Sequence, residues 1–287
     1  MISSSLITAP FKAVAQLKAL LGETPIYDEI QDVFYCVDIK GSALWICDPY
    51  TLNARSLKVP TLTSAALLTN DPQQLLLVSQ SGLFLLNLKD ESLRLFYPFS
   101  FTQVRPNEAQ IAPDGVLWFS TMGLQAQAHA GAMFRFDPQL HNFSLVQADI
   151  TIPNTLIFNE GQTTFFDTAS GDVFNCDLNG QGLVKIPSCL NGTPDGSCLT
   201  DDGLILNANW GASELRLFAV HNGYTLKASL PVPARQPSSC ALGGRDLNLL
   251  FVTTAIDGLA KPNFLDGQAF VAPSSLKGRL NYRFTLI

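Results

Sequence analysis

Short apolar runs of five to eight residues alternate along nearly the whole chain with clusters of Gly, Pro, Asn and Asp. Runs of this length, rich in Val, Ile, Leu and Phe and bounded by turn residues, predict β-strands. The runs come in pairs with a turn between them, so each pair predicts a hairpin. The six predicted hairpins are Val33–Ile39 with Ala43–Asp48, Gln74–Ser79 with Gly82–Leu88, Val116–Thr121 with Ala132–Asp137, Thr163–Thr168 with Asp172–Leu178, Gly203–Ala208 with Glu214–Val220, and Leu247–Thr254 with Gln268–Ala272.

The hairpins recur at a spacing that indicates a structural repeat. Comparable points near the ends of their second strands follow one another at steps of 39, 50, 40, 42 and 53 residues; these points are Asp48, Asn87, Asp137, Asp177, Ala219 and Ala272. One four-stranded propeller blade takes about 40 residues. We therefore expect an all-β fold, a six-bladed β-propeller with four-stranded antiparallel blades, formed by residues 1–287 as one domain. A sandwich of two sheets is the alternative, but it does not account for six hairpins at this spacing.

The N-terminal segment allows two interpretations. The run Phe11–Leu21 is the only one with a pattern compatible with a helix. The same segment, within residues 1–21, could instead supply the outer strand that closes the last blade. Both interpretations stay open at the level of the sequence.

Composition and charge exclude several functions. Apolar residues make up 47% of the 287 residues, and the net charge is −6 with no basic cluster, so we expect no nucleic-acid partner. The longest apolar stretches are far shorter than the roughly 20 residues that cross a bilayer, so we expect no membrane partner. A closed propeller needs no partner to cover its sheet edges, and we expect a monomer or a weak homodimer.

Location and redox state follow from the N-terminal residues and the cysteines. Residues Met1–Ser5 place no positive charge ahead of an apolar run, which predicts a cytoplasmic protein without a secretory signal. The cysteines are scattered and form no C-x-x-C pair, so we expect reduced and mostly buried thiols. They are Cys36, Cys47, Cys176, Cys189, Cys198 and Cys240.

Common catalytic motifs are missing from the sequence. The three histidines, His129, His141 and His221, lack the spacing of a zinc site and are expected in surface loops. The chain has no G-x-S-x-G, no G-x-x-x-x-G-K-[ST] and no G-x-G-x-x-G segment. A serine hydrolase, a P-loop enzyme and a dinucleotide-binding enzyme are therefore disfavoured.

Four polar residues recur at intervals that match the blades. Glu23, Asn107, Asn154 and Asp195 are separated by 84, 47 and 41 residues, which correspond to two blades, one blade and one blade. Each would lie just ahead of an innermost strand, so all four would converge on one mouth of the central channel. Carboxylate and amide oxygens gathered there favour a hard divalent cation, which predicts a metal site. The alternative is that each is an ordinary turn residue.

Ordered motifs around these residues resemble a known family. They are Gly22-Glu23-Thr24-Pro25, Tyr35-Cys36-Val37-Asp38-Ile39, Thr121-Met122-Gly123, Ala130-Gly131-Ala132-Met133-Phe134, Ile152-Pro153-Asn154-Thr155-Leu156, Thr193-Pro194-Asp195-Gly196 and Asp257-Gly258-Leu259. The chain is similar to the senescence-marker-protein, regucalcin and gluconolactonase family of six-bladed propellers. The resemblance extends from residue 22 to residue 259.

The resemblance implies roles for individual residues. Glu23, Asn154 and Asp195 match the ligands of one divalent metal ion, expected to be Ca²⁺, with Zn²⁺, Mn²⁺, Mg²⁺ and Fe²⁺ as alternatives. Arg105 and Asn107 match the family's substrate-binding pair. The implied activity is metal-dependent hydrolysis of a sugar lactone, with Asp195 as the catalytic residue.

Several positions depart from the family pattern. Glu108 and Ala109 stand where the family has an Asp-Gly turn, and Leu124 and Gln125 stand where its members often carry acidic residues that hold sugar hydroxyls. Thr24 and Thr155 replace glycines, and because threonine adopts a positive φ with difficulty, we expect those loops to bend differently.

These departures leave alternatives to sugar lactone hydrolysis. One is a hydrolase of a less polar lactone or ester, and another is a non-catalytic calcium-binding propeller. The loop Leu124–Gly131 is a candidate lid that would bring His129 to the substrate, or else a plain connection between strands.

Overall fold

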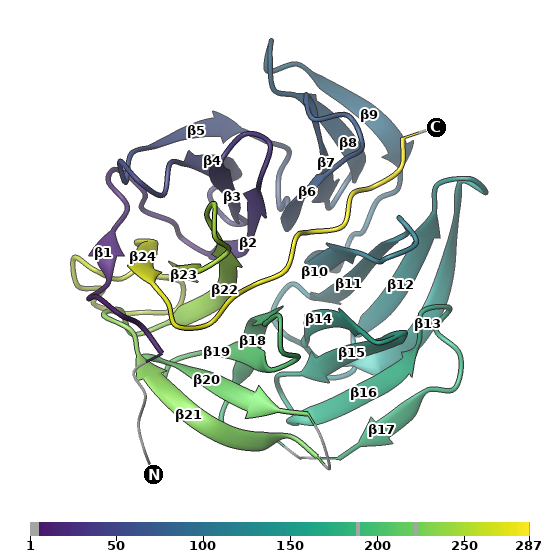
Figure 1. Cartoon of the computed structure of the whole chain (residues 1–287). Helices are drawn as coiled ribbons and strands as arrows, with labels where there is room; N and C mark the ends of the chain where they lie inside the picture. Colours follow the sequence, from purple (N-terminus) through teal and green to yellow (C-terminus); the bar gives the residue numbers. More distant parts are fainter. Residues whose placement is uncertain (1–5, 188–189, 221–222, 287) are drawn as a thin grey trace.

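The fold is a ring of six sheets. The computed structural model describes residues 6–187, 190–220 and 223–286. Within these ranges there is no helix, and 24 strands form six four-stranded antiparallel sheets around a central axis (Figure 1). The predicted all-β, six-bladed propeller with four-stranded antiparallel blades is therefore confirmed.

Each blade follows the chain from the channel outward. Blade 1 contains β2 (Gly22–Asp28), β3 (Val33–Asp38), β4 (Ala43–Cys47) and β5 (Ala54–Lys58); blade 2 contains β6 (Ala65–Leu68), β7 (Gln74–Ser79), β8 (Gly82–Asn87) and β9 (Leu93–Pro98); blade 3 contains β10 (Val104–Ile111), β11 (Leu117–Gly123), β12 (Gly131–Asp137) and β13 (Asn142–Ile150). Blade 4 contains β14 (Pro153–Asn159), β15 (Gln162–Asp167), β16 (Asp172–Asp177) and β17 (Val184–Ile186); blade 5 contains β18 (Pro194–Leu199), β19 (Ile205–Asn209), β20 (Glu214–Ala219) and β21 (Thr225–Pro231). Blade 6 contains β22 (Pro237–Gly243), β23 (Leu249–Thr254), β24 (Phe270–Pro273) and β1 (Lys12–Ala13). The six predicted hairpins are the two middle strands of each blade.

The last blade is completed from the N-terminal side. β1 pairs with β24, with Lys12 opposite Val271 and Ala13 opposite Phe270. The segment Phe11–Leu21 thus contributes the outer strand of blade 6, and the helical interpretation of it is wrong. Residues at the start and near the end of the sequence are therefore held in one sheet.

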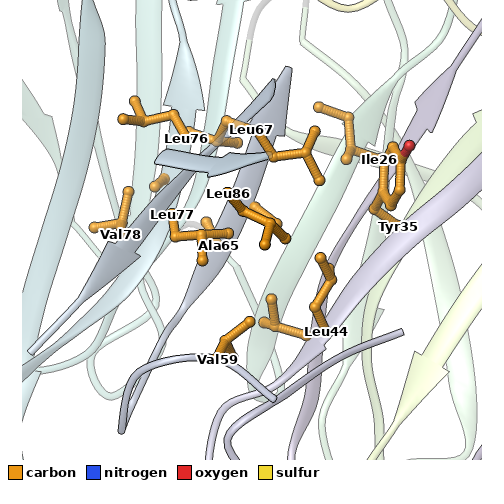
Figure 2. Close-up of a cluster of buried hydrophobic side chains, with 14 of the residues drawn as sticks. Ile26, Tyr35, Leu44, Val59, Ala65, Leu67, Leu76, Leu77, Val78 and Leu86 are labelled. Atoms are coloured by element: carbon orange, nitrogen blue, oxygen red, sulfur yellow. The ribbon is translucent and has the colours of Figure 1, made fainter. Parts of the chain in front are cut away.

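Apolar side chains pack each blade against its neighbour. Figure 2 shows Ile26 of blade 1 beside Leu67 of blade 2, in one cluster of buried side chains that also contains Tyr35, Leu44 and Leu76. Both faces of the middle strands are buried between blades, which is why their sequences are nearly continuous apolar runs rather than alternating ones. This packing holds the innermost strands at fixed positions around the channel.

A C-terminal strap, residues 274–286, crosses one end of the ring (Figure 1). It contacts residues at the C-terminal ends of innermost strands: the Asn281 side chain donates to the Tyr27 carbonyl at 2.8 Å, and the Phe284 amide donates to the Leu68 carbonyl at 2.9 Å. Arg283 pairs with Asp28 at 3.0 Å. The strap therefore covers the mouth of the channel opposite the N-terminal ends of these strands.

The described cysteines are all free. Cys36, Cys47, Cys176 and Cys240 are buried, and Cys198 is partly exposed. Cys189 lies outside the described residues. No helix capable of crossing a membrane occurs in the described ranges.

Phe284 provides a test of what the strap contributes. Its ring is fully buried and contacts Phe96 of blade 2 and Phe136 of blade 3. Phe284→Ala leaves a cavity between these blades and is expected to lower the free energy of unfolding by about 3–5 kcal/mol. Tyr282→Ala, at a side chain that is 44% exposed, is the control and should change it by less than about 1 kcal/mol. Urea unfolding measures both free energies. Equal decreases in the two variants would contradict the prediction that Phe284 stabilises the junction between blades 2 and 3.

Candidate functional site

The candidate residues lie at β-bulges in the innermost strands. The register with the second strand shifts between Glu23 and Ile26, between Pro106 and Ala109, between Asn154 and Leu156, and between Pro194 and Ser197. A bulge turns successive side chains away from the strict alternation of a strand and is often found beside active sites. Glu23, Asn154 and Asp195 are the second residues of their strands and Asn107 is the fourth residue of β10, so all four lie inside the strands and not ahead of them as the sequence predicted.

Side chains at the bulges bond to backbone carbonyls of the next blade. Thr24 Oγ1 donates to Ser64 O at 2.8 Å, Asn107 Nδ2 to Pro153 O at 3.0 Å, and Thr155 Oγ1 to Asp195 O at 2.6 Å. Ser238 Oγ, in the bulge of β22, donates to Gly22 O and joins blade 6 to blade 1. The mouth of the channel is thus bound together by hydrogen bonds between blades.

Thr24 and Thr155 both adopt a positive φ, the backbone conformation that usually favours glycine. Thr24 has a φ of 46° and Thr155 a φ of 53°. Threonine therefore takes a positive φ at both positions, although the sequence predicted that it would do so only with difficulty. The hydroxyl bonds to Ser64 and Asp195 offset the cost of a positive φ at a β-branched residue.

The Asn154 amide is held in one orientation. Its Nδ2 donates to Thr168 Oγ1 at 2.8 Å, and that hydroxyl donates to Pro194 O. The Asn154 oxygen therefore faces the opposite way, toward Asn107, whose Nδ2 donates to it at 2.7 Å. This leaves an amide oxygen directed into the group of candidate residues.

Arg105 and Asn107 form one unit. Arg105 Nη1 donates to Asn107 Oδ1 at 2.8 Å and to Pro106 O at 2.9 Å, and both side chains are buried. Burial lowers the pKa of Arg105, while the charges of Glu23, Asp195 and Asp257 act in the opposite direction. Arg105 is therefore within electrostatic reach of both candidate carboxylates.

The carboxylates at the mouth carry strongly perturbed acidities. Burial raises the pKa of Glu23 to about 7, against the Thr24 amide and the Arg105 charge, which lower it. Burial raises the pKa of Asp195 well above its usual range, and the charges of Glu23 and Glu108 add to this effect. Each carboxylate resists ionisation because it is desolvated beside others, and a bound cation would relieve that repulsion.

Glu108 belongs to the same group, although the sequence was interpreted only as a lost Asp-Gly turn at this position. Its side chain is buried, its Oε1 accepts the Ala109 amide at 3.0 Å, and its pKa is raised to about 8, mainly by burial and then by the charge of Glu23. Three carboxylates and one guanidinium leave two negative charges when all are ionised. The only signal in the sequence was an acidic residue directly after Asn107.

The donor set fits a hard divalent cation. Glu23 and Asp195 offer carboxylate oxygens and Asn154 an amide oxygen, and such cations prefer ligands of these types. Among the described residues no three Asp, Glu, His or Cys side chains gather closely enough to hold a metal together, so the expected set is two carboxylates and one amide. Glu108 would then act on a bound cation through its charge.

The loop Leu124–Gly131 contains Leu124 and Gln125, two of the residues that depart from the family pattern. Leu124 is 42% exposed, and Gln125 and His129 are also exposed. His129 Nδ1 is 3.1 Å from the Asp149 carbonyl, and the His129 amide donates to Thr151 Oγ1 at 3.2 Å. His129 is thus tied to the edge of its own blade. His221 lies outside the described residues.

Comparison with known proteins agrees with this architecture. Residues 21–256 match the model of the SMP-30/gluconolactonase/LRE-like region. The chain belongs to this family. It is 30% identical to a provisionally named sugar lactone lactonase of Rhizobium meliloti (strain 1021), covering 96% of this chain and 97% of that protein. It is 27% identical to the L-arabinolactonase of Azospirillum brasilense, covering 94% of each chain.

A solved structure shows the same fold. The crystal structure of a calcium-binding protein, regucalcin, from Agrobacterium tumefaciens superposes with a TM-score of 0.87 at 24% identity, over 96% of this chain and 98% of that one. The ring of six blades is therefore the fold of a known protein.

Thr155 tests the bonds between blades. Thr155→Val removes the hydroxyl bonded to Asp195 O and is expected to lower the free energy of unfolding by about 1–3 kcal/mol. Thr155→Ser keeps the hydroxyl and should stay within about 1 kcal/mol of the unchanged protein. Thr155→Gly loses the hydrogen bond but adopts the positive φ without strain. Its decrease in unfolding free energy should therefore lie between those of the Val and Ser variants. Denaturant unfolding measures the series, and equal Val and Ser variants would contradict this assignment.

The raised acidities predict how metal-free stability depends on pH. A carboxyl whose pKa rises from 4.5 unfolded to about 7 or 8 folded binds more protons in the folded state between these values. Stability should therefore fall as pH rises from about 5 to 8. Thermal unfolding with a chelator measures this decline, which Glu108→Gln should reduce and added Ca²⁺ should oppose. A midpoint that rises over this interval would contradict the prediction.

Proposed function

We propose that the protein is a divalent-metal-dependent lactonase that opens a sugar lactone at the mouth of the channel. The observation that supports this most is the buried group of Glu23, Asn154 and Asp195 beside Arg105 and Asn107. Relatives named as lactonases cover nearly the whole chain. The proposed ion is Ca²⁺, with Zn²⁺, Mn²⁺, Mg²⁺ and Fe²⁺ as alternatives to be tested.

The residues of the site fall into cation ligands and substrate-binding residues. Glu23, Asn154 and Asp195 would hold the cation, which as a Lewis acid would polarise the lactone carbonyl. Arg105 offers guanidinium donors to the carbonyl side or to a hydroxyl of the substrate. Asn107, anchored on Pro153 O, fixes the Arg105 side chain and so the position of the substrate.

Asp195 is the proposed acceptor of the proton from the attacking water. Water adds to the carbonyl carbon as Asp195 takes its proton, the ring C–O bond breaks, and the ring oxygen receives that proton, so the open chain leaves as a hydroxy acid. The raised pKa of Asp195 suits a proton acceptor near neutral pH, while a bound cation lowers that pKa again.

The exposed Leu124 favours a substrate with one less polar face. It lies in the loop after β11, where the side chain is 42% exposed. A lactone with an apolar substituent would place that substituent on Leu124, whereas a fully hydroxylated sugar would leave hydroxyls unpaired there. The substrate panel should therefore include simple γ-lactones as well as aldonolactones.

A pH-stat assay tests the proposal, because each lactone opened near neutral pH releases one proton. Metal-stripped protein is supplied with one of the five ions at a time and assayed against aldonolactones, γ-lactones and an aryl ester. Asp195→Asn and Glu23→Gln should weaken calcium binding more than about tenfold and turnover about 100-fold. Arg105→Ala should mainly raise KM, by about tenfold. Asp246→Asn, at an exposed carboxylate, is the control.

Each outcome separates the alternatives. Turnover of a lactone that needs an added ion supports the proposal. Calcium binding without turnover of any substrate would favour the non-catalytic calcium-binding propeller. Turnover of the aryl ester alone would favour a hydrolase of less polar esters.

A further inference from the structure

Two cysteines meet at the junction between blades 5 and 6. Cys198 lies in β18 and Cys240 in β22, and their Sγ atoms are 3.7 Å apart. The strands approach closely because Gly196 has no side chain: a Cβ there would overlap Ser239 of β22. The two sulfurs are therefore in van der Waals contact on neighbouring innermost strands.

Both cysteines line a cavity in the channel. The cavity has a volume of about 100 Å³ and lies between the innermost strands and strap residues Arg279–Tyr282. Cys198 is partly exposed, while Cys240 is buried and its thiol donates to the Leu206 carbonyl at 3.2 Å. A molecule the size of water therefore has room beside Cys198.

We propose that Cys198 and Cys240 are an oxidative modification site, at which hydrogen peroxide converts the two thiols into a disulfide that joins blades 5 and 6. The Cys198 thiol gives up its proton and its sulfur attacks one peroxide oxygen, the O–O bond breaks, and the leaving hydroxide takes up a proton, so that a sulfenic acid and one water form. Cys240 sulfur then attacks Cys198 sulfur, the S–O bond breaks, and the Cys240 proton leaves with the hydroxyl as a second water. Two thiols and one peroxide thus give one disulfide and two waters.

The environments of the two thiols set the order of these steps. Burial and the neighbouring Cys198 raise the pKa of Cys240, so Cys240 stays protonated and reacts poorly with peroxide itself. Cys198 faces the cavity and reacts first. Cys240, already in contact with it, then resolves the sulfenic acid.

Formation of the disulfide would shift the strand that carries Asp195 of the candidate metal site. An S–S bond is about 2.05 Å long, so the sulfurs must approach from 3.7 Å and draw β18 toward β22. Asp195 is three residues before Cys198 in the same strand, and its carbonyl accepts Thr155 Oγ1 and Asn207 Nδ2. This consequence rests on the proposed function, whereas the cross-link itself does not.

Peptide mapping by mass spectrometry tests the cross-link. Metal-free protein is treated with hydrogen peroxide, quenched and digested without reduction. The expected product is one peptide pair joining Cys198 to Cys240, with the loss of two hydrogens, and Cys240→Ser should stop at a sulfenic acid on Cys198 that dimedone traps.

Cys36 and Cys47 provide an internal control. Their thiols also interact in blade 1, both are buried, and neither is among the residues that line the cavity. They should remain thiols at a peroxide dose that cross-links Cys198. Free Cys198 and Cys240 after treatment, or equally fast joining of Cys36 to Cys47, would overturn the proposal.

Calorimetric calcium titration tests the coupling to the site. The oxidised and reduced proteins should differ in calcium affinity by at least about threefold, and peroxide-treated Cys240→Ser should match its untreated form. Equal affinities would overturn the coupling. Absence of calcium binding in both forms would count against the proposed function, while the mass of the peptide pair still decides the cross-link.

Discussion

The mouth of the channel depends on side-chain hydrogen bonds that cross from one blade to the next. Apolar packing brings the blades together but has little directionality, so by itself it does not fix the height of one innermost strand against another. The hydroxyls of Thr24, Thr155 and Ser238 and the amide of Asn107 do so, because each bonds a particular carbonyl of the neighbouring blade. Carboxylates from separate blades are thereby held at one level.

The same bonds explain an unfavourable concentration of charge. Glu23, Glu108 and Asp195 are buried close together with one guanidinium, an arrangement that raises the pKa of all three carboxyls. Neighbours fixed by several hydrogen bonds keep these groups from moving apart to reach water. The protein thus maintains an electrostatic repulsion that a ligand of opposite charge would relieve, as is common at functional sites.

The sequence predicted the ring well because the hairpins carry strong local signals. Strands such as Gln74–Ser79 are apolar runs between turn residues, and their number and spacing select the propeller. The strap was not predicted, since residues 274–286 lack a strand pattern and are held by contacts with distant strands such as β2 and β6. The role of N-terminal residues stayed open because a two-residue edge strand leaves almost no periodic signal.

Within the site, register identified Glu23, Asn154 and Asp195 as one level of the ring, but it could not reveal Glu108. Strict alternation would send consecutive side chains to opposite faces, and only the bulge at Pro106–Ala109 lets Asn107 and Glu108 belong to one group. The backbone conformation of Thr24 and Thr155 was predicted incorrectly for a related reason. Their positive φ is compensated by bonds to residues about 40 positions away, which local preference does not include.

The position of the strap also limits how the protein can be assembled. Blade 6 needs residues 12–13 to pair with residues 270–271, and the junction between blades 2 and 3 needs Phe284. During synthesis, the ring of blades therefore cannot close until residue 284 has left the ribosome. Ring closure therefore follows the synthesis of blade 6 and of the strap, and apolar edges of the earlier blades stay exposed until then.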